Sequence, residues 1–226
     1  MSDGGPHKVE LSNGDTIETR ACVIASGAHP RELGLASEQA LKNKGVSYCA
    51  TCDGALYRDV PVVVAGGGDS AMEEALFLAR FASEVIVVHR REKLRASKFM
   101  QDQAFASEKI TFCWNSVVDE VLDVDQDKVT GAVVRDVQDG TTQTISCKGF
   151  FPSIGHVPNT SFLKGQLVLD DSGYIHLPDG GRSESTVEGV FVAGDCADSR
   201  YRQAVTAAGM GCRAAIDGER WLQTVE

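Results

Sequence analysis

The stretch Val60-Pro61-Val62-Val63-Val64-Ala65-Gly66-Gly67-Gly68-Asp69-Ser70-Ala71 decides the fold. Its first half is a continuous apolar run, typical of a strand buried on both faces of a parallel sheet. Pro61 is compatible with such a strand only near its start, where no ladder donor is lost. The glycines then lead into helical spacing over 70–82, and residues 85–88 form the next apolar run. The sequence therefore predicts a βαβ unit.

Alternating helix and strand signals continue on the C-terminal side of this unit. Residues 97–106 are predicted as a helix and 110–114 as a strand, whereas β-rich segments separated by Asp-rich turns predict an antiparallel meander over 117–124, 129–137 and 142–147. A further strand at 190–193 and a helix at 203–222 follow. We predict an α/β protein.

Two segments are predicted to carry the chain from one domain to the other. Gly27-Ala28-His29-Pro30 and Gly155-His156-Val157-Pro158 each pair a glycine with a proline just after an apolar stretch. The predicted domains are therefore 30–156, inserted between the two crossings, and 1–29 together with 157–226.

Length, charge and cysteine content exclude several classes of protein. The chain has 226 residues and a net charge of -10, which argues against nucleic acid as a partner and against adsorption to an anionic membrane. The N-terminus has no signal-peptide pattern, and no apolar run approaches the roughly 20 residues of a membrane span. The seven cysteines are scattered apart from one pair. This usage favours a reducing cytoplasm over secretion.

Gly66-x-Gly68-x-x-Ala71 matches the dinucleotide fingerprint in its proper setting, after a strand and before a helix. The first glycine permits the tight turn, the second lets the backbone approach a pyrophosphate, and the small third residue lets the helix pack on the strand. Gly209-x-Gly211-x-x-Ala214 has the same spacing but follows helical residues, so we interpret its glycines as sites of close helix packing.

His89-Arg90-Arg91, with Arg95 one turn further, follows the second strand of the βαβ unit. An NAD site would place an acid there for the ribose hydroxyls, whereas guanidinium groups suit a 2′-phosphate, so the segment favours NADP. The alternative is a solvated basic cluster.

Cys49-Ala50-Thr51-Cys52-Asp53-Gly54 places two thiols at a spacing that can close a small disulfide ring. A zinc half-site and inert thiols are the alternatives, but no second CxxC or HxxxH supplies further zinc ligands, and we predict no metal. The other cysteines resemble isolated small apolar residues. Asp53 could shuttle a proton to a thiolate or simply belong to an Asp-Gly turn.

Gly194-Asp195 follows the strand predicted at 190–193. A carboxylate at the C-terminal edge of a strand could accept hydrogen bonds from a ligand hydroxyl, or it could cap a helix.

Taken in order, these motifs closely resemble those of the low-molecular-weight thioredoxin reductases, which are NADPH-dependent flavoproteins. The resemblance covers nearly the whole chain and extends to Gly66 through Ala75, Ile154-Gly155-His156 and Tyr201-Arg202-Gln203-Ala204. It implies two Rossmann-like domains of three-layer ββα architecture: an FAD domain, incomplete in this sequence, and an NADPH domain that carries the thiol pair. Electrons would pass from NADPH to FAD, then to the Cys49/Cys52 disulfide, and then to thioredoxin or a thioredoxin-like protein.

The resemblance also implies a role for each matching residue. Cys52 would face the flavin, Cys49 would attack thioredoxin, and Asp53 would act as acid and base. The implied NADPH contacts are Gly66, Gly68, Asp69, Ser70, Ala71, His89, Arg90, Arg91, Arg95 and Gly155. The implied FAD contacts are Gly194, Asp195, Arg202, Gln203 and Ala204. A homodimer is also expected.

The beginning of the chain differs from the family pattern. Family members begin with a strand, a GxGxxG turn and a helix that hold the ADP half of FAD, whereas this sequence begins at what resembles their β-meander, Val9 to Ile17. We therefore expect weak FAD binding by this chain alone, and an exposed apolar face on Val190 to Val192 that promotes association.

Three functions from different classes follow from these observations. The first is a thioredoxin-disulfide reductase, and the second is a flavin-deficient NADP-binding module. The third is an interaction module without reductase turnover. Tightly bound flavin, NADPH binding without flavin, or dimerisation with neither cofactor would distinguish them.

Overall fold

The computed structural model describes residues 6–179 and 182–225, which divide into two compact units. One unit is Pro30–Gly155, and the other contains the described residues of Met1–His29 and His156–Glu226. No helix within these described ranges combines the length and apolarity needed to cross a membrane.

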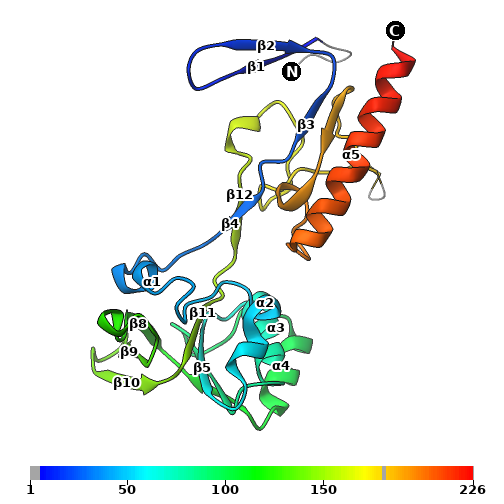
Figure 1. The fold of residues 1–226 in the computed structure, drawn as a ribbon. Coiled ribbons are helices and arrows are strands. Elements are labelled where there is room, and N and C mark those ends of the chain that lie inside the picture. Colours follow the sequence, from blue (N-terminus) through cyan, green and yellow to red (C-terminus); the bar gives the residue numbers. More distant parts are fainter. Residues whose placement is uncertain (1–5, 180–181, 226) are drawn as a thin grey trace. The chain divides into compact units, whose positions relative to one another are not determined.

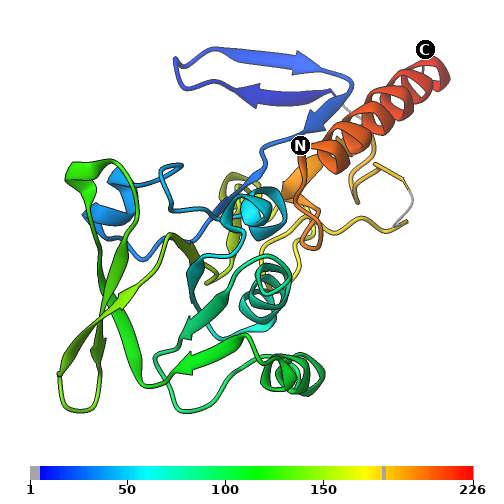
Figure 2. The same ribbon diagram turned by 60° about the horizontal axis from the view of Figure 1, so that its bottom comes forward.

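The unit Pro30–Gly155 is built in three layers (Figure 1). Its centre is a parallel sheet with the strand order β11-β5-β6-β7, formed by β5 (Pro61–Ala65), β6 (Glu84–Val88), β7 (Ile110–Cys113) and β11 (Gly149–Pro152). Helices α3 (Asp69–Leu78) and α4 (Lys98–Ala106) cover one face. On the other face lies an antiparallel sheet of β8 (Ser116–Val121), β9 (Gly131–Asp136) and β10 (Thr142–Ser146), as Figure 2 also shows. The predicted α/β class is confirmed.

Successive side chains of β5 point to opposite faces of the sheet, and both faces are covered, which explains why this strand is apolar at every position. Val62 and Val64 pack with the α3 side chains Met72 and Leu78, whereas Val63 packs with residues of the antiparallel sheet. All three valines are fully buried. Burying a valine side chain contributes about 1.5–3 kcal/mol, so the central strand stabilises both layers at once.

Short elements complete the unit. They are α1 (Ala36–Ala40), α2 (Ala50–Asp53) and the 3-10 turns Gly54–Tyr57 and Val124–Gln126. The helix predicted over 70–82 ends at Leu78, and its last residues instead form turns in which Phe81 and Ala82 donate to the Leu78 carbonyl. β11, which pairs in parallel with β5, was not predicted.

The other unit contains a hairpin, a pair of parallel strands and a long helix. Strands β1 (His7–Glu10) and β2 (Thr16–Thr19) form the hairpin, and β3 (Cys22–Ile24) pairs in parallel with β13 (Val190–Val192). Helix α5 (Ala204–Thr224) lies along β13 (Figure 1). The remaining elements are β4 (Ala28–Pro30), paired with β12 (His156–Pro158), and the 3-10 turns Ser161–Leu163 and Gly194–Cys196.

Two expectations about this second unit are wrong. Val190, Phe191 and Val192 are buried rather than exposed, because Phe191 packs against Trp221 of α5 while the two valines pack against an apolar cluster around Leu163 and Ile175.

The interpretation of Gly209 and Gly211 as close-packing sites is also wrong. Both lie inside α5, and a Cβ atom added at either would meet nothing within 4 Å. The glycine of α5 that packs closely is Gly218, where a Cβ would lie 3.4 Å from the Phe191 ring.

Candidate functional site

The glycine turn after β5 has the steric requirements of a dinucleotide loop. A Cβ on Gly66 would collide with the Ser153 carbonyl oxygen and lie 2.8 Å from the Ala71 Cβ, and a Cβ on Gly67 would collide with the His89 ring. At Gly68, the nearest atom to such a Cβ is Arg95 Nη2 at 4.0 Å. Packing therefore requires glycine at Gly66 and Gly67. Gly68 instead leaves open space at the start of α3, where a ligand can approach the backbone.

The arginine segment is tied to the glycine turn by backbone hydrogen bonds. The Arg95 amide donates to the Gly67 carbonyl oxygen at 2.7 Å, and the Ser97 amide donates to Asp69 Oδ1 at 2.8 Å. This second bond holds the pKa of Asp69 below its usual value. The guanidinium-bearing segment is consequently positioned by the same turn that would receive a pyrophosphate.

The buried His89 side chain packs between the glycine turn and the arginine segment. Its Nε2 donates to the Lys93 carbonyl oxygen at 3.0 Å, and its ring fills the space beside Gly67. Burial lowers the pKa of His89, and the charges of Arg91 and Arg95 lower it further. A neutral imidazole therefore supports the turn at physiological pH, and the arginines supply the positive charge.

The predicted nucleotide contacts surround one cavity of about 780 Å³. Among its lining residues are Gly66, Gly68, Asp69, Ser70, His89, Arg90, Arg91, Arg95 and Gly155. Ala71 does not line the cavity, because it is fully buried where α3 packs on the sheet. Among the described residues, Arg90, Arg91 and Arg95 have no ion-pair partner, so their charges remain available to an anion.

Part of the cavity wall comes from residues that sequence reasoning missed. Arg31 and Leu33 line it from the segment after Pro30, and the Arg135–Asp119 pair lines it from β9 and β8. Arg135 binds Asp119 through two hydrogen bonds, of 2.8 and 3.0 Å. These residues lie far apart in the sequence, and no local motif marks them.

Cys49 and Cys52 form a disulfide in the same unit. Cys49 is the N-cap of α2, and its sulfur accepts a hydrogen bond of 3.1 Å from the Cys52 amide. Cys52 is exposed, whereas Cys49 is half-buried. The two sulfurs are therefore joined to each other, as redox chemistry requires, rather than held apart as metal ligands.

Asp53 is fixed beside the disulfide by Ser47, a residue that the motif did not indicate. The buried Ser47 hydroxyl donates to Asp53 Oδ2 at 2.7 Å and accepts a hydrogen bond of 3.1 Å from the Cys49 amide. One hydroxyl thus links the carboxylate to the backbone of the half-buried cysteine. The Asp53 carboxylate is therefore held within the segment that carries the disulfide.

In the other unit, unsatisfied polar atoms gather where β3 and β13 end. Among the described residues, the buried atoms Asp195 Oδ1 and Ser26 Oγ have no hydrogen-bond partner. Burial raises the pKa of Asp195, and the nearby Asp198 carboxylate raises it further. Because parallel strands place ligand sites at their carboxyl ends, these two orphaned oxygens mark a place for a hydrogen-bonding ligand.

The predicted contacts Arg202, Gln203 and Ala204 form the approach to the N-terminus of α5. Arg202 has a φ of 48°, and its amide donates to Asp198 Oδ2 at 3.1 Å. Burial lowers the pKa of His156 to about 4, and the Arg202 and His29 charges contribute. His156 is thus neutral near pH 7, and its Nδ1 has no partner among the described residues.

Comparison with known proteins assigns the chain to a family. Residues 2–211 match the family model described as pyridine nucleotide-disulphide oxidoreductase. The fold matches the solved thioredoxin reductases of Giardia duodenalis, at 43% identity and a TM-score of 0.92, and Streptococcus pyogenes, at 39% identity and 0.88. The matches cover 96% and 95% of this chain, and 71% and 69% of those structures.

Two relatives give the same result at the level of sequence. The chain is 50% identical to the thioredoxin reductase of Streptomyces clavuligerus over 93% of its own length, and 49% identical to that of Mycolicibacterium smegmatis over 96%. It spans 65% and 69% of the lengths of these relatives. The chain therefore belongs to the pyridine nucleotide-disulphide oxidoreductases, and among them to the thioredoxin reductase family.

Proposed function

We propose that this chain acts as an NADPH-dependent thioredoxin-disulfide reductase. The observation that carries the proposal is the presence, in one compact unit, of a Cys49–Cys52 disulfide and a glycine-turn cavity lined by arginines without ion-pair partners among the described residues. When bound, NADPH supplies a hydride and FAD relays the electron pair to a disulfide. The chain's own residues bind and orient these cofactors and carry out the thiol–disulfide exchange with the substrate.

The Pro30–Gly155 unit fits a phosphorylated dinucleotide. The turn from Gly66 to Ser70 and the N-terminus of α3 would hold the pyrophosphate, because backbone N–H groups and the helix dipole favour an anion there. Arg90, Arg91 and Arg95 would hold a 2′-phosphate through charge-assisted hydrogen bonds. The cavity volume of about 780 Å³ is within the range of ligand sites.

The other unit fits part of a flavin. Asp195 and Ser26 offer unsatisfied oxygens to hydroxyl or ring N–H donors, and the N-terminus of α5 offers positive potential to a carbonyl oxygen. β13 continues into a 3-10 turn, and the described residues of this unit contain no strand–glycine turn–long helix arrangement like that at Gly66. We therefore propose that the chain holds FAD weakly, so that added FAD raises activity.

The disulfide performs the exchange with the protein substrate. Two electrons and two protons convert the Cys49–Cys52 bond into two thiols. The Cys49 thiolate then attacks a substrate sulfur, which forms a mixed disulfide and releases one substrate thiolate. The Cys52 thiolate next attacks Cys49 Sγ, which restores the original disulfide and releases the second substrate thiolate. Asp53, held by Ser47, exchanges protons with the thiols.

NADPH oxidation by the whole chain in the presence of oxidised thioredoxin tests this proposal. We expect oxidation that requires thioredoxin, stops when thioredoxin is fully reduced, and increases with added FAD until the flavin site is saturated. Nucleotide binding without oxidation at any FAD concentration would contradict the proposal and favour an NADP-binding module. Oxidation that proceeds equally without thioredoxin would also contradict it.

A further inference from the structure

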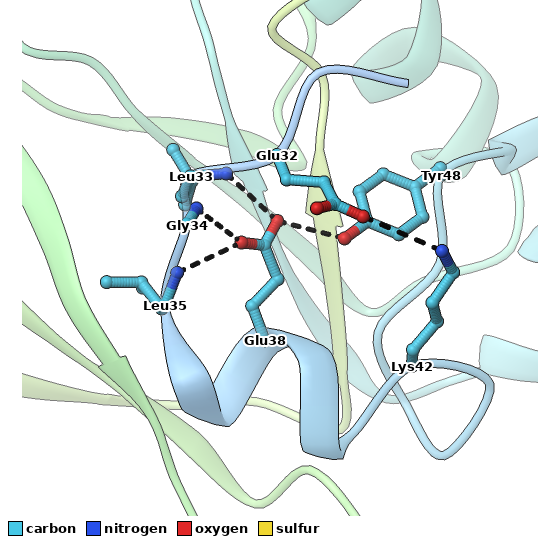
Figure 3. Close-up of polar contacts among 7 residues, drawn as sticks. All are labelled: Glu32, Leu33, Gly34, Leu35, Glu38, Lys42 and Tyr48. Atoms are coloured by element: carbon cyan, nitrogen blue, oxygen red, sulfur yellow. Dashed lines mark hydrogen bonds and ion pairs between the residues drawn. The ribbon is translucent and has the colours of Figure 1, made fainter. Parts of the chain in front are cut away.

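Glu38 is a buried carboxylate that the proposed chemistry does not use. Its side chain, on α1, is fully buried, and it accepts hydrogen bonds from two directions (Figure 3). On one side are three successive amides, those of Leu33 at 3.1 Å, Gly34 at 2.9 Å and Leu35 at 3.4 Å. On the other side is the Tyr48 hydroxyl, at 3.0 Å from Oε1.

Neutral groups rather than a cation stabilise this charge. Among the described residues, Glu38 forms no ion pair; the nearby Lys42 instead pairs with Glu32 at 3.6 Å and lies over the Tyr48 ring, 5.2 Å from its centroid. A buried carboxylate is costly unless its oxygens are fully hydrogen-bonded. Each of the four donors therefore helps to keep the Glu38 carboxylate in place.

The amide side of this cluster belongs to the nucleotide cavity. Leu33 lines the cavity, and so does Arg31 two residues earlier. Gly34 has a φ of +82°, a left-handed conformation that turns the adjacent amides toward Glu38. The carboxylate thus fixes the conformation of one wall of the cavity.

The hydroxyl side belongs to the redox-active segment. Tyr48 immediately precedes Cys49, whose amide is bonded to Ser47. Burial raises the pKa of Tyr48, and its hydrogen bond to Glu38 raises it further, so the hydroxyl keeps its proton and acts as the donor. The same carboxylate thus also restrains the backbone that leads into the disulfide.

We propose that Glu38 is a positioning residue that holds both the Arg31–Leu35 wall of the nucleotide cavity and the Tyr48–Cys49 segment. This role rests on the proposed function and deepens it, because it assigns one buried group to two parts of the reaction. The two sets of donors to Glu38 can be tested separately by mutation. Substituting Tyr48 removes the hydroxyl donor and leaves the three amide donors unchanged.

Glu38→Gln tests both sides together. The amide keeps the shape of the side chain but turns one acceptor into a donor that faces other donors, so the loop and the tyrosine are no longer held together. We expect the Kd for NADP⁺, measured by calorimetric titration of the whole chain, to rise about tenfold. After reduction with dithiothreitol, the rate of Cys49 alkylation by iodoacetamide, followed by peptide mass, is expected to rise about fivefold.

Tyr48→Phe tests the hydroxyl side alone and is conservative enough to keep the fold. It removes one donor and leaves the three amide bonds in place. We expect the alkylation rate of Cys49 to rise about fivefold while the Kd for NADP⁺ stays within about twofold of the unaltered protein. An unchanged alkylation rate in this variant would overturn the proposal.

Two neighbouring substitutions provide controls. Ser37→Ala removes the hydroxyl that accepts from the Val121 amide at 2.9 Å, so it weakens the attachment of α1 without touching Glu38. Glu120→Gln removes an exposed carboxylate of β8, next to Val121 and outside the cavity lining. Both variants are expected to keep both readouts within about twofold.

Two further results would contradict the positioning role. One is an unchanged Kd in Glu38→Gln, and the other is an equal loss in Ser37→Ala, which would indicate general destabilisation of α1. Failure of the unaltered chain to bind NADP⁺ would instead contradict the proposed function itself.

Discussion

Cys52→Ser is expected to abolish thioredoxin reduction by the whole chain, lowering turnover by at least about a thousandfold. Without the second sulfur the disulfide is absent, so no electron pair is stored, and a mixed disulfide at Cys49 has no neighbouring thiol to resolve it. A thioredoxin with one active-site cysteine, activated as a mixed disulfide with thionitrobenzoate, is instead expected to accumulate as a covalent adduct of Cys49, visible by non-reducing electrophoresis, because the thionitrobenzoate thiolate departs. NADP⁺ affinity is expected to stay within about twofold, because neither cysteine lines the nucleotide cavity.

Cys212→Ser is the matched control for this loss. Cys212 is a free, exposed cysteine on α5, so its replacement removes a thiol without affecting the disulfide. We expect unchanged turnover in this variant. Normal turnover in Cys52→Ser would contradict the assignment of the disulfide as the redox centre. If the adduct formed in Cys49→Ser and not in Cys52→Ser, Cys52 would be the cysteine that attacks thioredoxin.

Arg90→Ala combined with Arg91→Ala is expected to remove most of the preference for NADPH over NADH. Each guanidinium group would make charge-assisted hydrogen bonds to the 2′-phosphate, and no carboxylate among the described residues competes for them. The ratio of the Kd for NAD⁺ to that for NADP⁺ is expected to fall about a hundredfold. Most of this change should come from weaker NADP⁺ binding, since NAD⁺ lacks the phosphate.

Arg58→Ala combined with Arg80→Ala controls for the loss of positive charge. These two arginines lie in the same unit but over the rings of Phe81 and Phe77, and neither lines the cavity. The nucleotide preference should stay the same in this control. A preference that also persists in the Arg90 and Arg91 variant would identify those arginines as ordinary surface charges.

Local patterns in the sequence predict the centre of the fold well. Short-range patterns are enough to predict the strand over Val60 to Ala65, the glycine turn and the helix that follows. The structure places β5 and α3 at these positions. The antiparallel meander over β8, β9 and β10 is also confirmed, because alternating residues and Asp-rich turns mark it. β11 was missed because it begins at Gly149 and ends at Pro152, two residue types that usually mark turns, although the strand completes the sheet beside β5.

Non-local contacts account for part of what the sequence did not predict. The Ser47 hydroxyl bonded to Asp53 and the donors around Glu38 lie 3 to 10 positions from their partners, and no recognised motif marks them. The cavity wall at Arg31 and Arg135, in contrast, depends on segments that meet only in the folded chain. The exposure expected for Val190 to Val192 was wrong for the same reason. Residues of α5 and the segment around Leu163 cover these positions, and nothing in the strand itself indicates that cover.

The redox state of Cys49 and Cys52 after one anaerobic exposure of the whole chain to NADPH with excess FAD tests most directly whether the cavity and the disulfide serve one reaction. Free thiols would be alkylated at once and the peptide containing residues 49–52 weighed. We expect both cysteines to carry an alkyl group after NADPH with FAD, and the disulfide to persist after FAD alone and largely after NADH. An intact disulfide in the presence of NADPH and FAD, in a chain that binds NADP⁺, would contradict this.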